Sequence, residues 1–171
     1  MRASTLLVGF VLVAACAQSE PQPDASETDS SPFVGAWRLV SWRATGSDGA
    51  VRYPYGEQAK GQLVYTASGQ MSAQLLRPDV DISSFAEMDG PAALQHLGET
   101  AFFGYWGSYV VDEAAGTVTH HLQGSLSPDY VGTAQVRGFR FQDADNLYLT
   151  AQLSDASDPG EMNELHWERV R

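Results

Sequence analysis

The sequence predicts an all-β fold, a single antiparallel up-and-down β-barrel of about eight to ten strands with a short helical insert at about residues 82–98. Two observations predict this fold. Nearly every apolar segment after residue 33 is short, rich in β-branched or aromatic residues, and bounded by Gly, Asp, Asn or Ser. These segments also follow one another as hairpins, and such a sheet has two exposed edges unless it closes into a barrel.

Nine segments have the composition of strands, and turn-forming residues separate them. The turns include Gly46-Ser47-Asp48-Gly49, Ala67-Ser68-Gly69, Asp112 to Gly116, and Asp143-Ala144-Asp145-Asn146. The candidate strands, in chain order, are Ala36–Ala44, Ala50–Tyr55, Gly61–Thr66, Gln70–Leu76, Phe103–Val111, Gly116–Gly124, Thr133–Phe141, Leu147–Leu153 and Met162–Val170.

One stretch between the fourth and fifth candidate strands departs from this pattern. Ser84 to Glu87 has the spacing of a capping box, and Gly90-Pro91 begins a second short helical run, Ala92–Leu97, that Gly98 can end. The apolar residues of this insert are Phe85, Met88, Leu94 and Leu97. They give the insert an apolar side, so we expect it either to cover one mouth of the barrel or to pack on its outer wall.

The N-terminus has the features of an export signal. Residues 1–15 combine a charged start, Met1-Arg2, with an apolar run from Leu6 to Ala15 that is shorter than the roughly 20 residues of a membrane span. Val13-Ala14-Ala15-Cys16 resembles the lipobox of bacterial lipoproteins, in which the cysteine is acylated and becomes the new N-terminus. We therefore expect a lipid anchor on Cys16, the alternative being an ordinary cleaved signal followed by a chance cysteine.

Composition bounds the rest of the chain. Residues 16–32 are polar and rich in Pro, and they predict a lipid-anchored, disordered linker before a single domain at residues 33–171. The resemblance to bacterial lipoproteins also implies an address, because an Asp follows the cysteine in inner-membrane members and Ala17 stands there in this chain. We therefore expect the protein at the periplasmic face of the outer membrane. The formal charge of −11 disfavours nucleic acid as a partner and direct adhesion to anionic lipid. A monomer that contacts the membrane only through its lipid anchor is the expectation.

The ends of the predicted domain carry a resemblance. Gly35-Ala36-Trp37 opens the first strand and Arg169 lies near the end of the last, which is similar to the lipocalins. In that superfamily the arginine covers the tryptophan at the closed end of the barrel, an arrangement that a cation–π contact stabilises. Phe33 to Trp42, Gly61 to Thr66 and Thr119-His120-His121 resemble, more narrowly, the bacterial and fungal lipocalin-like domain family. The resemblance implies a lipocalin-type barrel and leaves the activity undefined.

Strand alternation predicts which side chains face the interior. His120 shares a face with Val118 and Leu122, so we expect it to point inward and His121 outward. The same count gives a polar set on otherwise apolar inner walls, and these are the candidate ligand-binding residues: Arg77, Tyr105, Tyr109, His120 and Arg137.

Each member of this set also has a structural interpretation. A buried His or Tyr is commonly a core residue with one satisfied hydrogen bond, and an inward Arg often pairs with a carboxylate. Two arginines inside a cavity would be costly unless paired or met by an anion, which indicates a ligand with a carboxylate. Glu57 and Glu99 are alternative partners for the arginines.

Three hypotheses of function follow. The leading one is a carrier of a small hydrophobic or amphiphilic ligand. The second is a small barrel enzyme, isomerase- or cyclase-like, in which His120 and Tyr109 are the acid and base. The third is a ligand-free interaction module of the cell envelope, with a barrel filled by aromatic side chains. No catalytic motif, cofactor motif or metal-binding spacing is present in the sequence, so no cofactor or metal is expected and we favour binding over catalysis.

Overall fold

The computed structural model describes residues 31–81, 83, 88–152 and 158–171. The predicted signal peptide, Cys16 and most of the predicted linker lie outside the described residues. So does the predicted capping box at residues 84–87.

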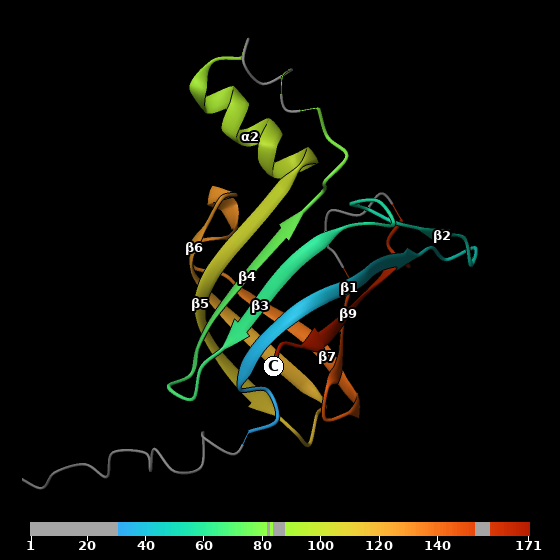
Figure 1. Cartoon of the computed structure of the whole chain (residues 1–171), viewed down its shortest axis with the longest axis vertical. Helices are drawn as coiled ribbons and strands as arrows, with labels where there is room; N and C mark the ends of the chain where they lie inside the picture. The colour runs from blue at the N-terminus through green and yellow to red at the C-terminus, as the bar shows by residue number, and fades with distance from the viewer. Residues whose placement is uncertain (1–30, 82, 84–87, 153–157) are drawn as a thin grey trace, which may run out of the picture.

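The described chain folds into a closed antiparallel β-barrel, as the sequence predicts (Figure 1). Eight strands form the barrel in the order β1-β3-β4-β5-β6-β7-β8-β9, and β9 pairs back onto β1 to close it. The strands are β1 (Gly35–Thr45), β2 (Val51–Arg52), β3 (Lys60–Tyr65), β4 (Gln70–Leu76), β5 (Phe102–Asp112), β6 (Thr117–Ser125), β7 (Ala134–Asp143), β8 (Asn146–Ala151) and β9 (Met162–Arg169).

The strand β2 is much shorter than predicted and is not part of the barrel wall. It forms two pairs with the last residues of β1, Ala44 and Thr45. The candidate strand at 50–55 therefore ends early, and Tyr53 to Tyr55 lie in a loop that leads to β3. Pro54 explains part of this correction, because proline donates no ladder hydrogen bond.

The strands β3 and β9 pair with different parts of β1. β3 pairs only with Gly35–Arg38, whereas β9 pairs from Trp37 to Thr45, with a bulge between Leu39 and Ser41. The extra residue of a bulge reverses the alternation of side chains beyond it. Trp37 and Leu39 point inward before the bulge, and Trp42 lines the barrel interior after it.

One end of the barrel is closed, and we call it the floor. Arg169 lies over the Trp37 ring, with its Cζ atom 4.1 Å from the ring centroid. Its guanidinium donates to the carbonyl oxygens of Val34 (2.7 Å), Pro32 (2.6 Å) and Ala144 (3.0 Å). Gly35 has a φ of +137°, and a Cβ atom there would lie 2.7 Å from Nη1 of Arg169. The floor thus requires the arginine, the tryptophan and the glycine together.

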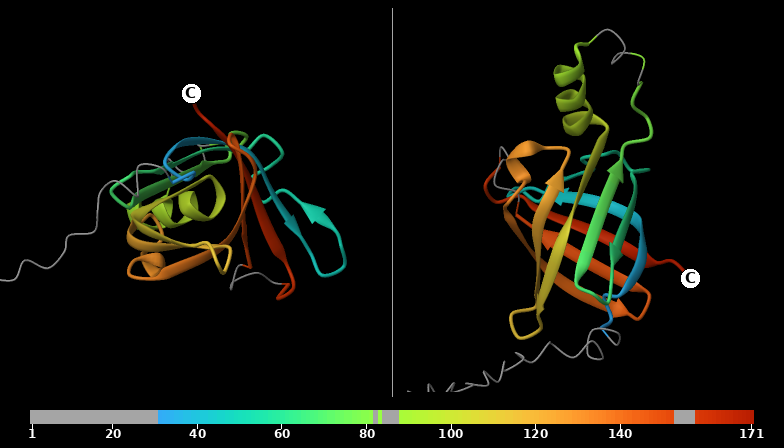
Figure 2. Two further views of the ribbon diagram at one scale, coloured as in Figure 1. Left: turned by 90° about the horizontal axis from the view of Figure 1, so that it is seen from below. Right: turned by 90° about the vertical axis from the view of Figure 1, so that its left-hand side faces the viewer.

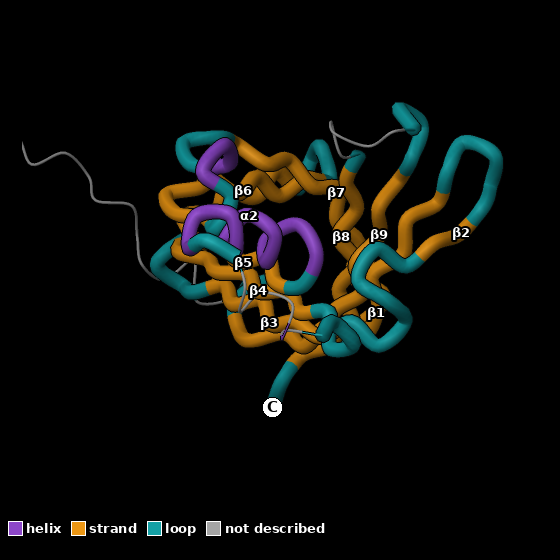
Figure 3. Tube along the Cα trace, turned by 90° about the horizontal axis from the view of Figure 1, so that it is seen from above, coloured by secondary structure: helices purple, strands orange, loops and turns teal. Residues whose placement is uncertain are grey.

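The opposite end, the mouth, lies beneath the helix α2 (Gly90–Thr100). Figure 2 shows α2 beyond the ends of β4 and β5, and Figure 3, looking down on the mouth, shows it above the β4–β6 side of the barrel. Gly98 does not end the helix as expected. It lies inside α2 and faces Leu126, since a Cβ on Gly98 would lie 3.4 Å from that side chain. Within the described ranges, no helix has the length and apolarity to cross a bilayer.

Candidate ligand-binding site

The barrel interior is filled at the floor and hollow toward the mouth. A cavity of about 820 Å³ lies between α2 and the middle of the barrel, within the size range of small-molecule sites. Its lining is mainly apolar, with a few polar groups. The lining residues are Trp42, Tyr55, Leu75, Pro91, Leu94, Gln95, Gly98, Phe103, Tyr105, Leu126, Ser127, Pro128, Asp129, Tyr130, Arg137, Ala151, Asn163 and Leu165.

Aromatic side chains occupy the half of the barrel near the floor. Phe33, from the segment just before β1, inserts its ring among the strands. Its ring centroid lies 5.4 Å from that of Tyr65, 4.9 Å from that of Phe139 and 5.0 Å from that of Phe141. The filled barrel expected for an interaction module is therefore present in this half only.

A buried trio of polar side chains separates the filled half from the cavity. His120 is 1% exposed, its Nε2 lies 2.6 Å from the Tyr65 hydroxyl, and its Nδ1 lies 3.2 Å from the Tyr105 hydroxyl. Burial, with Arg137 as a second cause, lowers the pKa of His120 to about 3. Burial likewise raises the pKa of Tyr65 well above its ordinary value and that of Tyr105 above its own. At neutral pH all three side chains are therefore uncharged.

Because Tyr65, His120 and Tyr105 are uncharged, their hydrogen bonds fix which atom carries each proton. A neutral imidazole has one nitrogen that donates and one that accepts. Tyr65 is 1% exposed, and among the described residues its hydroxyl hydrogen-bonds only to His120. Its proton therefore points at Nε2, since any other direction would leave a buried, unsatisfied donor. The Nδ1–H of His120 then donates to the Tyr105 oxygen. The proton of the Tyr105 hydroxyl is left free to point at the cavity that Tyr105 lines.

Arg137 lies beside Tyr105 on the cavity wall. Its guanidinium donates to the carbonyl oxygen of Val136 at 3.1 Å and to Oε1 of Gln135 at 3.4 Å. Its positive charge partly offsets the effect of burial on the pKa of Tyr105. No carboxylate in the described part of the chain lies within ion-pair distance of it, although Asp129 also lines the cavity. Arg137 thus brings a positive charge to the cavity, without an ion-pair partner among the described side chains.

A second polar chain supports the opposite wall. The indole Nε1 of Trp42 donates to Oδ1 of Asn163 at 2.7 Å, and Nδ2 of Asn163 donates to Glu161 at 3.3 Å. The buried carboxylate of Glu161 accepts two bonds from Arg52, at 2.7 and 2.5 Å. Each buried polar group in this series of hydrogen bonds has a partner. The series therefore holds Trp42 in place at the cavity.

The domain matches the sequence model described as the lipocalin-like domain over residues 34–170. The chain belongs to the lipocalin-like domain family. A search of curated proteins finds no match. Among solved structures, the lipocalin-like barrel is similar to a redesigned β-barrel, with a TM-score of 0.43 and 11% identity over 86% of this chain and 95% of that one. It is also similar to a de novo designed fluorescence-activating β-barrel, with a TM-score of 0.41 and 13% identity over 87% of this chain and 100% of that one.

The structure brings together three of the five candidate residues of the lipocalin-like domain, namely Tyr105, His120 and Arg137. Tyr109 lies nearer the floor, where its hydroxyl donates to the carbonyl oxygen of Thr66 at 3.1 Å and its ring lies 4.6 Å from Tyr65. Arg77 follows the end of β4 and pairs with Asp79 at 3.0 Å, outside the cavity lining. The inward placement expected for Arg77 is therefore corrected, because the strand ends before it.

The acid–base pair of the enzyme hypothesis is not assembled. His120 is sealed from the cavity and bonded to Tyr65 and Tyr105, while Tyr109 bonds to a backbone carbonyl. The described residues also contain no group of three His, Cys, Asp or Glu side chains arranged to hold a metal ion. We infer no catalytic role for His120.

Sequence reasoning missed Tyr65, Trp42 and Asn163. Tyr65 could have been found, because strand alternation places it on the inward face with Leu63. Trp42 could not, because its inward position depends on the bulge in β1. Asn163 gave no signal, since a single polar residue in a strand is ordinarily solvent-facing.

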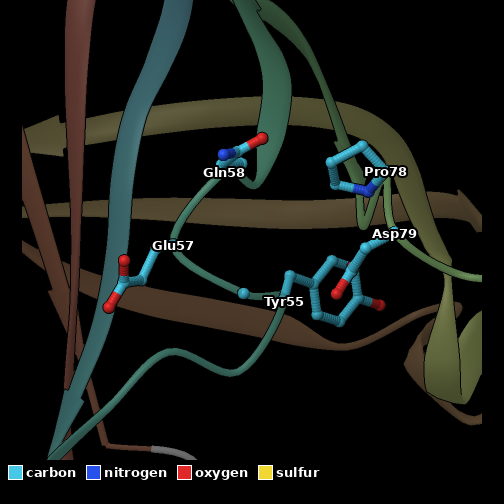
Figure 4. Close-up of a pocket in the computed structure, with 6 residues that line it drawn as sticks. Tyr55, Glu57, Gln58, Pro78 and Asp79 are labelled. Carbon is cyan, nitrogen blue, oxygen red and sulfur yellow. The ribbon is translucent and has the colours of Figure 1, made fainter.

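A smaller hollow, of about 430 Å³, lies on the outside near the mouth. It is formed by the loop 55–58 and by Pro78 and Asp79. Figure 4 shows Pro78 and Asp79 beside the Tyr55 ring, with the carboxylate of Glu57 pointing away from that ring. Tyr55 lines both hollows, and its hydroxyl donates to the carbonyl oxygen of Gly98 in α2 at 3.1 Å. Tyr55 is the one aromatic residue among the described residues that line this outer hollow, and none of them is a cation.

Proposed function

We propose that the lipocalin-like domain binds a small hydrophobic or amphiphilic molecule in the hollow half of its barrel. The observation that carries the proposal is the division of the interior, with an aromatic core at the floor and a cavity of about 820 Å³ toward the mouth. A barrel that served only as a rigid module would gain stability by filling that volume.

The walls of the cavity support an apolar occupant. Phe103 packs edge-on against Tyr130 with ring centroids 5.3 Å apart, and Trp42 packs on Tyr55 at 4.8 Å. These rigid aromatic pairs, with Leu75, Leu126 and Leu165, offer a large apolar surface. Removal of this surface from water by a ligand contributes roughly 25 cal/mol per Å² of apolar area.

A cavity-filling variant tests this proposal. Ala151 is 6% exposed and lines the cavity, so Ala151→Phe places a ring in the ligand's volume. We expect titration with a neutral fluorescent lipid, such as the methyl ester of parinaric acid, to show saturable binding to the natural chain and at least tenfold weaker binding to Ala151→Phe. Ala134→Phe is the matched control, because Ala134 lies exposed on β7.

The proposal predicts a second observable. Native mass spectrometry of the protein gently extracted from its own cells is expected to show a bound small molecule that organic solvent removes. No saturable binding of the ester, together with no bound molecule, would refute the carrier function.

We propose further that Cys16 carries a lipid that anchors the protein at the periplasmic face of the outer membrane. The support is the sequence Val13-Ala14-Ala15-Cys16 and the short apolar run before it. Growth with an alkyne-tagged fatty acid is expected to label the natural chain and not Cys16→Ala. An unlabelled natural chain released in soluble form with the periplasm would contradict the anchor.

A further inference from the structure

We propose that the ligand carries a carboxylate head group, which binds the Arg137 guanidinium and the Tyr105 hydroxyl on one wall of the cavity. This inference rests on the proposed function and adds the chemical class of the ligand. It is carried by two features of this wall, a cation without an ion-pair partner among the described side chains and a hydroxyl group whose oxygen accepts from His120 and whose proton is left for the cavity.

The first observation is the state of Arg137. Within the described part of the chain, its five N–H groups meet two acceptors, the Val136 carbonyl and the Gln135 amide oxygen. Both acceptors are uncharged, so they leave the positive charge of Arg137 uncompensated. A half-buried guanidinium is most strongly stabilised by an oxyanion, and the planar fork fits a carboxylate.

The second observation is the direction of the proton on Tyr105. The Tyr105 oxygen accepts from His120, so its single O–H group is left as a donor on the wall that Arg137 also lines. Tyr65 fixes this direction from the sealed side, because its own proton occupies Nε2 of His120. Tyr65 and His120 are thus positioning residues, and Tyr105 presents a donor next to the Arg137 charge.

Charge balance favours a carboxylate over a phosphate. Arg137 and Asp129 are the only charged side chains among the described lining residues, and they have opposite signs. A monoanion matches the single positive charge of Arg137, whereas a phosphate dianion would add a second negative charge to a cavity that Asp129 also lines. The remaining lining, largely aromatic and aliphatic, suits the apolar part of the ligand.

The test compares parinaric acid with its methyl ester in fluorescence titrations of the full-length protein at neutral pH. The two probes share the tail and differ in charge at the head group. We expect the acid to bind at least about tenfold more tightly than the ester. This is the difference in affinity that one charge-assisted hydrogen bond produces. Competition of parinaric acid by dodecanoate should be stronger than by dodecyl phosphate.

Variants assign the preference to residues. Arg137→Gln should reduce the ratio of the affinity for the acid to that for the ester to about one. Tyr105→Phe, and more weakly Tyr65→Phe, should reduce the same ratio. The matched control is Arg140→Gln, which makes the same charge change on the outer face of the same strand, where Arg140 lies over the Tyr148 ring. Circular dichroism and a cooperative urea transition show that each variant is folded.

The outcomes separate the two proposals. Equal affinity of the natural chain for acid and ester would overturn the carboxylate site and leave the carrier function standing. An equal loss in Arg140→Gln and Arg137→Gln would also overturn it, because the preference would then follow overall charge. If neither probe binds saturably, the carrier function itself fails.

Discussion

At the scale of single residues, the floor shows how a short motif becomes a structural element. Gly35 is required for two reasons. Its φ of +137° is strained for any other residue, and a side chain there would displace the Arg169 guanidinium. Arg169 in turn joins the chain before β1 to the end of β9 through three backbone carbonyls. The motif acts as one unit.

Substitutions in this unit should therefore not be additive. We expect Arg169→Ala to lower the free energy of unfolding by about 2–4 kcal/mol, because it removes charged hydrogen bonds and the cation–π contact. Gly35→Ala should cost about 1–3 kcal/mol. In a double-mutant cycle measured by urea unfolding, the two losses should sum to more than the loss in the double variant. Strict additivity would contradict the shared role.

His120 predicts a specific dependence of stability on pH. Its pKa is about 3 in the folded chain and about 6.5 in the unfolded chain, so below pH 6.5 the unfolded state binds the extra proton. Stability is complete above pH 6.5 and falls as the pH decreases toward 3. Between pH 7 and pH 5 we expect a loss of about 2 kcal/mol, measured by urea unfolding at the two pH values.

Most carboxylates titrate below pH 5, so a change in stability between pH 7 and pH 5 comes mainly from histidines. His120→Gln should remove most of the loss. His166→Gln is the control, since His166 is only partly buried and its pKa is lowered less sharply. A full loss in His120→Gln would mean that another group is responsible.

At the scale of elements, irregularities in the strands build the cavity. The β1 bulge turns Trp42 inward, and a second bulge, between β5 and β6, occurs where Gly107 passes close to β6. A Cβ on Gly107 would lie 2.0 Å from the carbonyl oxygen of His121. Regular alternation therefore fails for Trp42, which follows the β1 bulge and lines the cavity.

The contact between Tyr55 and α2 is expected to hold the helix over the mouth. Tyr55→Phe removes the hydrogen bond to the Gly98 carbonyl and leaves the packing on Trp42. We expect the amides of α2 to exchange with solvent about two- to tenfold faster, the effect of one hydrogen bond, in hydrogen–deuterium exchange. Tyr53→Phe, in the same loop and exposed, is the control. Unchanged exchange in Tyr55→Phe would show that α2 is held by other contacts.

At the scale of the whole molecule, stability and binding are assigned to opposite halves of one barrel. Phe33 is enclosed by aromatic rings, whereas Phe103 has the cavity on one side. We expect Phe33→Ala to cost about 3–5 kcal/mol and Phe103→Ala less than half of that, both measured by urea unfolding. Similar losses for both variants would mean that the cavity half is packed as tightly as the floor.

The fold was predictable from the sequence and the site only in part. Eight strands of the barrel follow from composition and turns, and alternation correctly places His120 inside and His121 outside. The hydrogen bonds of His120 could not be predicted, because Tyr65 and Tyr105 reach it from strands 55 and 15 residues away in sequence. The inward position predicted for Arg77 was wrong for a different reason. Alternation of side chains applies only within a strand, and β4 ends at Leu76, one residue before Arg77.

The insertion of Phe33 at the floor has a consequence for orientation. The described chain enters the barrel at the floor, and the mouth beneath α2 lies at the opposite end (Figure 1). The N-terminal part of the chain therefore joins the barrel at its closed end. A lipid on Cys16, as proposed above, would attach through this end, and a ligand would enter or leave the cavity at the opposite one.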